Sequence, residues 1–140
     1  MEMALQKQEQ ILCKALHTDL GKSKTEMMCE IGLVQGEIRW MKQHLGRLCR
    51  QKHVRTPLAQ FAAKSYQSPS PYGNVLIMSP WNYPVLLTLE PLVDAIAAGN
   101  TAVVKPSAYA PASANVLKDL LEEWTVKDSV CRKDMKSLVL

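Results

Sequence analysis

Two short polar clusters in the sequence could contribute to a chemical site, because each directly follows an apolar run of strand type. The first cluster, Ser79–Asn82, comes after Val75–Met78. The second, Lys105–Ser107, comes after Thr101–Val104. Ligands of open parallel sheets bind outside the carboxyl ends of the strands. If the two strands are neighbours, an amide, an ammonium group and a hydroxyl group share one ledge, which suits an anionic or ribose-bearing ligand.

Asn82 has two interpretations. It precedes Tyr83–Pro84, where its side chain could accept a hydrogen bond from an early helical N–H and cap a helix. The residue pattern alone favours this cap. The alternative is an amide donor, held by the flanking prolines and directed at charge that develops on a substrate oxygen. For Lys105, a solvated lysine and a ligand-binding lysine fit the pattern equally well.

The elements around these clusters alternate between strand and helix. Val75–Met78 and Thr101–Val104 are continuously apolar, as in a buried parallel sheet. Pro84–Ala98 is predicted to be an apolar helix with a kink at Pro91. A second helix is predicted over Pro111–Glu123. The order strand, helix, strand, helix predicts an α/β fold with half of a doubly wound sheet.

The N-terminal part of the sequence predicts two helices packed as a hairpin. The first covers residues 3–20, and Gly21 is a natural stop. Ser23 and Glu26 form a capping box for the second, which runs from about Thr25 to Arg50. The apolar face of the first helix comprises Leu5, Ile11, Leu12, Ala15, Leu16 and Leu20. The second carries a heptad-spaced stripe of Met27, Ile31, Val34, Ile38, Met41, Leu45 and Leu48.

The segments that join and follow these elements give weaker signals. A basic loop is expected after the second helix, and Ala59–Tyr66 is ambiguous. Gln67–Tyr72, with two prolines, is expected to be extended or turning, and an edge strand, which tolerates proline, is one option. Trp124–Leu140 has no strong period and no predicted place in the sheet. We therefore divide the chain into helices (1–56), an extended arm (57–72), a β-α-β-α unit (73–123) and a tail (124–140).

Composition excludes several function classes. The chain is 47% hydrophobic and 21% charged, which is typical of globular proteins rather than disordered ones. A net charge of +4 is too small to indicate nucleic-acid or membrane-surface binding. The basic segment Arg47–Arg55 lacks interleaved aromatic residues, so a solvated loop is favoured over a nucleic-acid site.

The spacing of the cysteines and the hydropathy of the chain bear on the cellular compartment in which we expect the protein. The cysteines lie at positions 13, 29, 49 and 131, and no pair has the close spacing of zinc or redox motifs. We expect reduced thiols in a cytoplasmic protein without a metal site. The apolar, uncharged stretch Val75–Leu89 is interrupted by two prolines and is too short to span a bilayer.

The two clusters also carry a family resemblance. The stretch "SPWNYPVLLTLEPLVDAIAAGNTAVVKPSAYAP" resembles the NAD(P)-dependent aldehyde dehydrogenases, specifically their class-3-like branch. The P-W-N motif and the AAGN…V-K-P-S block are the specific parts. The resemblance extends back through "EIGLVQGEIRWMKQHL" and "RTPLAQFAAKSY" and fades after Glu123. It implies a Rossmann-like cofactor domain, NAD or NADP as cofactor, and oxidation of an aldehyde to a carboxylic acid.

The resemblance also implies roles for the first cluster. Asn82 matches the family's oxyanion-hole amide, which stabilises the thiohemiacetal formed when a cysteine thiolate attacks an aldehyde. Ser79, Pro80 and Trp81 match the wall near the nicotinamide ribose. The 66–72 segment resembles the family's oligomerisation arm, so a homo-oligomer or association with a full-length relative is expected.

For the second cluster, the resemblance implies that Lys105 and Ser107 line the adenosine-ribose side of the cofactor site. The class-3 pattern continues K-P-S-E, whereas this sequence has Ala108 at the glutamate position. The missing carboxylate removes a ribose acceptor and a repulsion toward a 2′-phosphate. We therefore expect tolerance of NADP.

The family's catalytic cysteine and general-base glutamate lie downstream of the matched region and are not in this sequence. Cys13, Cys29 and Cys49 are expected to be small buried hydrophobes, and Cys131 matches no family motif. We expect a truncated or frameshifted fragment without dehydrogenase turnover of its own. The alternative is a non-catalytic module that binds a paralogue or itself through the heptad stripe and an open sheet edge.

Overall fold

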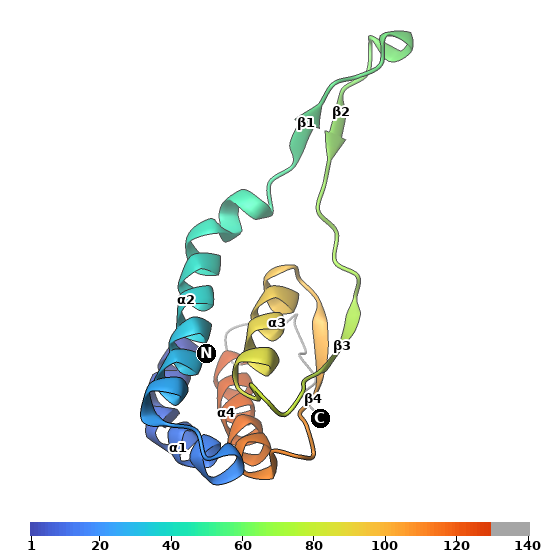
Figure 1. Ribbon diagram of the computed structural model, residues 1–140. Coiled ribbons are helices and arrows are strands. Elements are labelled where there is room, and N and C mark those ends of the chain that lie inside the picture. Colours follow the sequence, from blue (N-terminus) through green and yellow to red (C-terminus); the bar gives the residue numbers. More distant parts are fainter. Residues whose placement is uncertain (130–140) are drawn as a thin grey trace.

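A helical hairpin forms the N-terminal part of the computed structural model, which describes residues 1–129, with side chains through Trp124 (Figure 1). Helix α1 covers Glu2–Leu20 and helix α2 covers Lys24–Leu48. Gly21 ends α1 in the left-handed conformation with φ 62°, which glycine adopts without steric cost. The predicted Ser23–Glu26 capping box is present at the start of α2. The hairpin prediction is confirmed.

The predicted apolar faces are confirmed in part. In α1 the buried side chains are Leu5, Leu12, Ala15 and Leu16. Ile11, by contrast, is 55% exposed, because it lies at the margin of the narrow stripe that α1 presents to its neighbours. The N-terminal half of the α2 stripe, Met27–Ile38, is buried and contacts α3 as well as α1. Leu48 is exposed, because α2 extends past the body toward the arm (Figure 1).

Strands β3 (Asn74–Met78) and β4 (Thr101–Lys105) form a two-stranded parallel sheet within the described residues. The register pairs Asn74 with Thr101 and Met78 with Lys105. Helix α3 (Leu86–Ala97) packs against both strands. Ile77 and Val104 enter the core, whereas Leu76 and Met78 are exposed on β3. The expected continuous burial of Val75–Met78 is therefore wrong, because the described residues cover only one face of the sheet.

The helices around the sheet differ slightly from their predicted bounds. α3 begins at Leu86 rather than Pro84 and continues as one helix through Pro91. Its end is fixed by Asn100, whose side chain accepts a bond from Gly73 N and donates one to Ala95 O. Helix α4 (Pro111–Ser129) continues beyond the predicted end at Glu123. Helix α4 packs against α1, so the two helices lie side by side (Figure 1).

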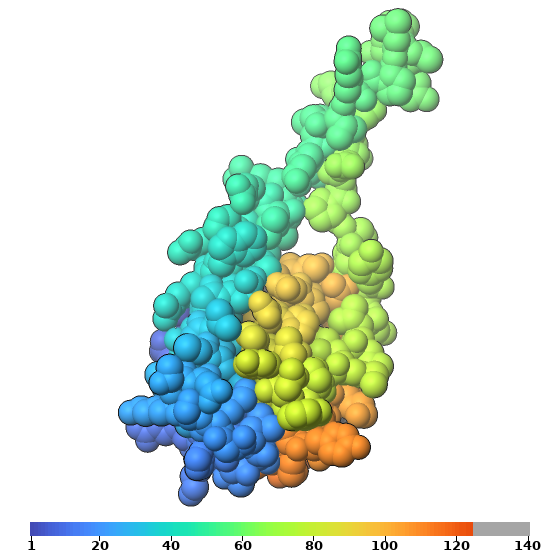
Figure 2. Space-filling view, in the orientation of Figure 1, coloured from blue at the N-terminus to red at the C-terminus, as the bar shows by residue number. Residues whose placement is uncertain are grey.

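A thin arm projects from the body between α2 and β3 (Figure 2). Strand β1 (Lys52–Val54) pairs antiparallel with strand β2 (Ser65–Gln67), and a short 3₁₀ helix, Leu58–Gln60, lies near the tip. The expected loop over Lys52–Val54 is wrong, and of the possible edge strand Gln67–Tyr72 only Gln67 belongs to a strand. The ladder joins two short exposed strands, which carry no burial pattern for a sequence to reveal.

None of the helices in residues 1–129 has both the length and the apolar character required to cross a bilayer.

Candidate functional site

The parallel register places the ends of β3 and β4 next to each other. Met78, the last residue of β3, pairs with Lys105, the last residue of β4. One residue further on, the backbone N–H of Ser79 donates to the carbonyl oxygen of Lys105 at 3.2 Å. The two polar clusters therefore begin at one edge of the sheet, as the sequence predicts.

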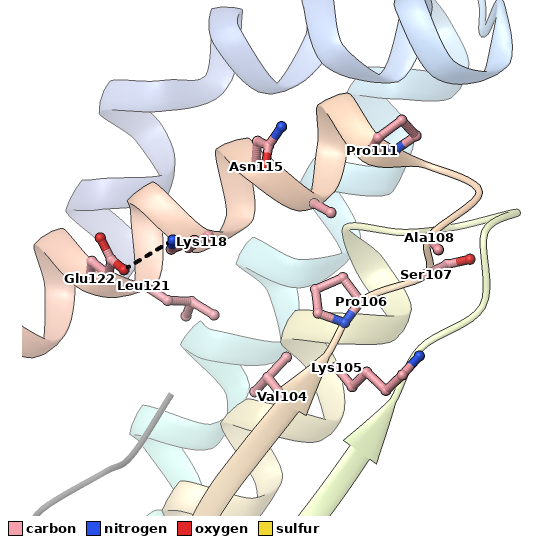
Figure 3. A pocket seen from close by; sticks show the side chains of 11 residues that line it. Val104, Lys105, Pro106, Ser107, Ala108, Pro111, Asn115, Lys118, Leu121 and Glu122 are labelled. Atoms are coloured by element: carbon pink, nitrogen blue, oxygen red, sulfur yellow. Dashed lines mark ion pairs between the residues drawn. The ribbon is translucent and has the colours of Figure 1, made fainter. Parts of the chain in front are cut away.

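A groove of about 800 Å³ lies between the end of β4 and helix α4 (Figure 3). Its polar lining residues are Lys105, Ser107, Asn115, Lys118 and Glu122. The Lys105 side chain extends toward the end of β3. Lys105 and Ser107 thus lie in one groove, and Ala108 contributes only a methyl group to it. An elongated ligand with a hydroxylated ring and a negative charge would match this lining.

The positive charge of the groove comes from two lysines with different environments. Lys118 forms an ion pair with Glu122 at 3.9 Å, and both side chains are exposed, so the pair contributes little energy. Lys105 is also exposed and forms no ion pair with any of the described side chains, which run through Trp124. The ammonium group of Lys105 is therefore available to an anionic or hydroxylated ligand. The Ser107 hydroxyl accepts a bond from Tyr109 N at 3.2 Å, which shapes the turn before α4.

The cap interpretation of Asn82 is wrong. The residue at the N-cap of α3 is Val85, and its side chain forms no cap hydrogen bond. The N–H groups of Val85 and Leu86 instead donate to Oε1 of Glu30, at 2.8 and 3.1 Å. Asn82 is exposed, and its amide has no hydrogen-bond partner in the described chain. A donor left free in this way is open to a ligand oxygen.

Glu30 is a residue that the sequence reasoning missed. It is 1% exposed in α2, and its Oε2 lies 2.5 Å from Nζ of Lys22. The same ammonium group lies 4.1 Å from the centroid of the Tyr83 ring. The signal in the sequence was a charged residue directly beside the apolar stripe, between Met27 and Ile31. That signal indicates burial but does not identify the partners.

The start of the first cluster is fixed by a pair of buried hydroxyl groups. Thr88 Oγ1 lies 2.6 Å from Ser79 Oγ and 2.5 Å from the carbonyl oxygen of Pro84. Ser79 and Thr88 are both buried. Pro80 and Trp81 between them are exposed. The residues predicted as a cofactor wall thus comprise one anchored serine and two side chains that face outward.

Carboxylates occupy both helix N-termini that follow the strands. Glu30 fills the start of α3, and Asp19 of α1 accepts bonds from Ala112 N at 3.1 Å and Ser113 N at 2.7 Å at the start of α4. Free helix N-termini bind phosphate. These two are already paired with negative charge, so a phosphate group of a ligand would be repelled from both. The sheet edge and the groove remain as the sites for ligand binding.

The described cysteines do not resemble an activated nucleophile. Burial, with a smaller contribution from Glu9, raises the pKa of the Cys13 thiol, which disfavours the reactive thiolate. Cys29 and Cys49 are exposed, so the expectation that they are small buried hydrophobes is wrong for both. Cys131 lies outside the described residues.

A strand-helix-strand-helix unit with a polar ledge at the strand ends is the architecture of a dinucleotide-binding α/β protein. The sequence profile described as "Aldehyde dehydrogenase family" matches residues 1–132. The chain belongs to the aldehyde dehydrogenase family, which confirms the predicted family and fold.

Individual relatives agree. The 4,4'-diaponeurosporen-aldehyde dehydrogenase of Staphylococcus aureus is 45% identical over 124 residues, which cover 88% of this chain and 27% of the relative. Aldehyde dehydrogenase family 3 member A2 of Rattus norvegicus is 38% identical over 125 residues, which cover 89% of this chain and 26% of the relative. A solved structure, the substrate-bound state of Staphylococcus aureus AldH, superposes with a TM-score of 0.85 at 45% identity. The match covers 87% of this chain and 27% of the solved one. The chain thus spans about a quarter of the length of these relatives.

Proposed function

We propose that this chain supplies part of the active site of an NAD(P)-dependent aldehyde dehydrogenase, namely the oxyanion donor and the adenosine-ribose side of the cofactor site. The observation that supports this proposal is the shared edge at which Ser79 N bonds to Lys105 O. That edge places the loop of Asn82 beside the groove of Lys105.

The proposed role of Asn82 is electrostatic. A thiolate that adds to an aldehyde carbon leaves a negative charge on the former carbonyl oxygen. A side-chain amide N–H that is held in place can donate to that oxygen, and removal of one such donor slows acyl-transfer enzymes by about 10²–10³. The free, exposed amide of Asn82 meets this requirement. No residue of this sequence matches the family's nucleophile or general base, so the proposal assigns both to another part of the active site.

The proposed role of the groove is to hold the ribose of NAD or NADP, the cofactor that accepts the hydride. Lys105 would donate to ribose hydroxyls, and Ser107 shapes the turn beneath them. Ala108 offers no carboxylate that could repel a 2′-phosphate. The proposal therefore includes comparable affinity for the two cofactors.

Calorimetric titration of the chain with NAD and with NADP tests this assignment. We expect weak binding of both, loss of binding in Lys105→Ala, and unchanged binding in Lys14→Ala, which removes an exposed lysine of α1 that does not line the groove. Equal binding by Lys105→Ala and the parent chain would overturn the assignment. Turnover of aldehyde by the 140-residue chain that is lost when one cysteine is replaced would overturn the proposal that the nucleophile lies outside this chain.

A second candidate function, association with itself or with a longer relative, rests on the arm. Leu58 is 90% exposed and Phe61 is 85% exposed near its tip, and apolar side chains gathered on a projecting hairpin favour a protein partner. The heptad stripe proposed for this role is unsuitable over Met27–Ile38, because that half is buried within the chain. Sedimentation of the parent chain should show concentration-dependent association that Phe61→Ser weakens; a monomer at all concentrations would contradict this candidate.

A further inference from the structure

The loop Ser79–Pro84, which presents Asn82, and the start of α3 that follows it contact two charged residues of the helical hairpin. Glu30 comes from α2, and Lys22 comes from the turn that joins α1 to α2. Neither residue lines the groove of Lys105. The function proposed above uses neither of them. Both side chains are almost fully buried, whereas the other described ion pairs involve more exposed lysine and arginine side chains.

Glu30 acts on the backbone directly after the loop. Its Oε1 accepts two bonds, from Val85 N at 2.8 Å and Leu86 N at 3.1 Å, across 55 and 56 positions of sequence. Its other oxygen receives Lys22 Nζ at 2.5 Å. Every partner of this buried carboxylate is therefore a charged or backbone donor that lies in a fixed direction. Breaking such a buried arrangement leaves a charge or an N–H group without a partner.

Lys22 extends this hold into the loop itself. Its Nζ lies 4.1 Å from the centroid of the Tyr83 ring, a cation–π contact. The Lys22 side chain is 11% exposed and Tyr83 is 47% exposed, so the contact is shielded from water on the lysine side. Tyr83 is the neighbour of Asn82 in sequence, and its ring position constrains the backbone from which the Asn82 amide projects. A simple helix cap would need the carboxylate alone and would leave Tyr83 free.

We propose that Glu30 and Lys22 are positioning residues that set the direction of the Asn82 amide. The pair fixes the loop at Tyr83 by the ammonium group and at Val85–Leu86 by the carboxylate. The serine–threonine contact at Ser79 fixes the other end. An oxyanion donor functions only when it is preorganised, and these contacts restrain the loop from which the exposed amide projects. This inference rests on the role proposed for Asn82.

The test is made on the 140-residue chain by NMR, with amide hydrogen exchange and the side-chain NH₂ resonances of Asn82 as the readouts. Two variants break the hold differently. Glu30→Gln keeps a hydrogen-bond acceptor for the helix start but loses the charge that holds Lys22. Lys22→Met keeps an apolar stem over Tyr83 but loses the ammonium group. The matched control is Asp19→Asn, which weakens the equivalent carboxylate cap at the start of α4 without touching the loop.

We expect both test variants to shift the Asn82 NH₂ resonances and to raise amide exchange at Val85, Leu86 and Leu87, whose N–H groups donate to Glu30 and to the Tyr83 carbonyl oxygen, by about tenfold or more. The amides of α1 and α4 should keep their protection. Asp19→Asn should raise exchange only at the start of α4. Unchanged Asn82 resonances in both variants would overturn the proposal. So would a rise in exchange that is uniform over the chain, because that outcome reports loss of stability alone.

The two proposals fail separately in this design. The exchange and resonance readouts need no cofactor, so they test the positioning role even if the chain binds neither NAD nor NADP. Conversely, Lys105→Ala should abolish cofactor binding without moving the Asn82 resonances. If Glu30→Gln does not fold, Lys22→Met still decides the positioning role, because it leaves both backbone bonds of Glu30 with an acceptor.

Discussion

The carboxylate of Asp19 lies 2.7 Å from the backbone nitrogen of Ser113, so the last turn of α1 caps the first turn of α4. A second bond joins the same carboxylate to Ala112 N at 3.1 Å. Together with Glu30 at the start of α3, this means that the hairpin caps both helices that follow the sheet strands. The hairpin is thereby a structural part of the cofactor-type unit rather than an appendage to it.

Asp19→Ala should lower the free energy of unfolding by about 1–2 kcal/mol. The substitution removes a side-chain cap and a favourable charge at a helix N-terminus. Urea unfolding followed by circular dichroism measures the change. Lys14→Ala, at an exposed site on the same helix, serves as the control and should change stability by no more than about 0.5 kcal/mol. Equal losses in the two variants would show that the Asp19 contacts contribute nothing specific.

Asn82→Ala should leave stability unchanged to within about 0.5 kcal/mol, because the amide is exposed and caps no helix. A true N-cap asparagine would cost about 1 kcal/mol on the same substitution. Thermal unfolding of the two chains separates these cases. A clear loss of stability would restore the cap interpretation and remove the argument that Asn82 is kept free for a ligand.

Stability should depend on pH through a group of carboxylates between α2 and α3. Burial raises the pKa of Glu37, with further contributions from Asp94 and Glu90, and burial also raises the pKa of Asp94. A carboxyl group with a raised folded-state pKa binds its proton more tightly in the native state. The native state therefore loses stability as pH rises from the ordinary carboxyl range through the raised folded-state pKa.

Asp94→Asn should relieve this cost. The variant should be more stable than the parent at pH 7, with the difference shrinking toward zero as the medium becomes acidic enough to protonate both carboxyl groups. Urea unfolding across this pH range provides the comparison. Asp119→Asn, at an exposed position of α4, should show no such pH-dependent gain. A gain that is constant with pH would mean that packing, not charge, is responsible.

The capping box should give the opposite pH dependence. Hydrogen bonds from the Ser23 side chain and backbone lower the pKa of Glu26. This contribution to stability is present above the unfolded-state pKa and is lost as pH falls through the lowered folded-state pKa. Glu26→Gln should therefore flatten that part of the acid unfolding curve. An unaltered curve would indicate that the Glu26 contacts persist in the unfolded chain or contribute no net energy.

The sequence determined the features that depend on neighbours along the chain. Gly21 and the Ser23–Glu26 box end one helix and begin the next, because their conformations and bonds involve residues within a few positions. Apolar runs separated by helices predicted the parallel unit, and that topology placed Ser79 and Lys105 at one edge of the sheet. These predictions needed only local propensity and the rule that ligands bind at the ends of parallel strands.

Only the tertiary structure decided which side chains are free and which are bound. Glu30 took the cap that the pattern favoured for Asn82, because α2 packs against α3 and brings a carboxylate to Val85 from 55 positions away. The exposed strands of the arm and the open face at Leu76 likewise depend on what lies opposite them. A residue type and its spacing fix what a side chain is able to do, whereas its partner is fixed by packing between segments that are distant in sequence.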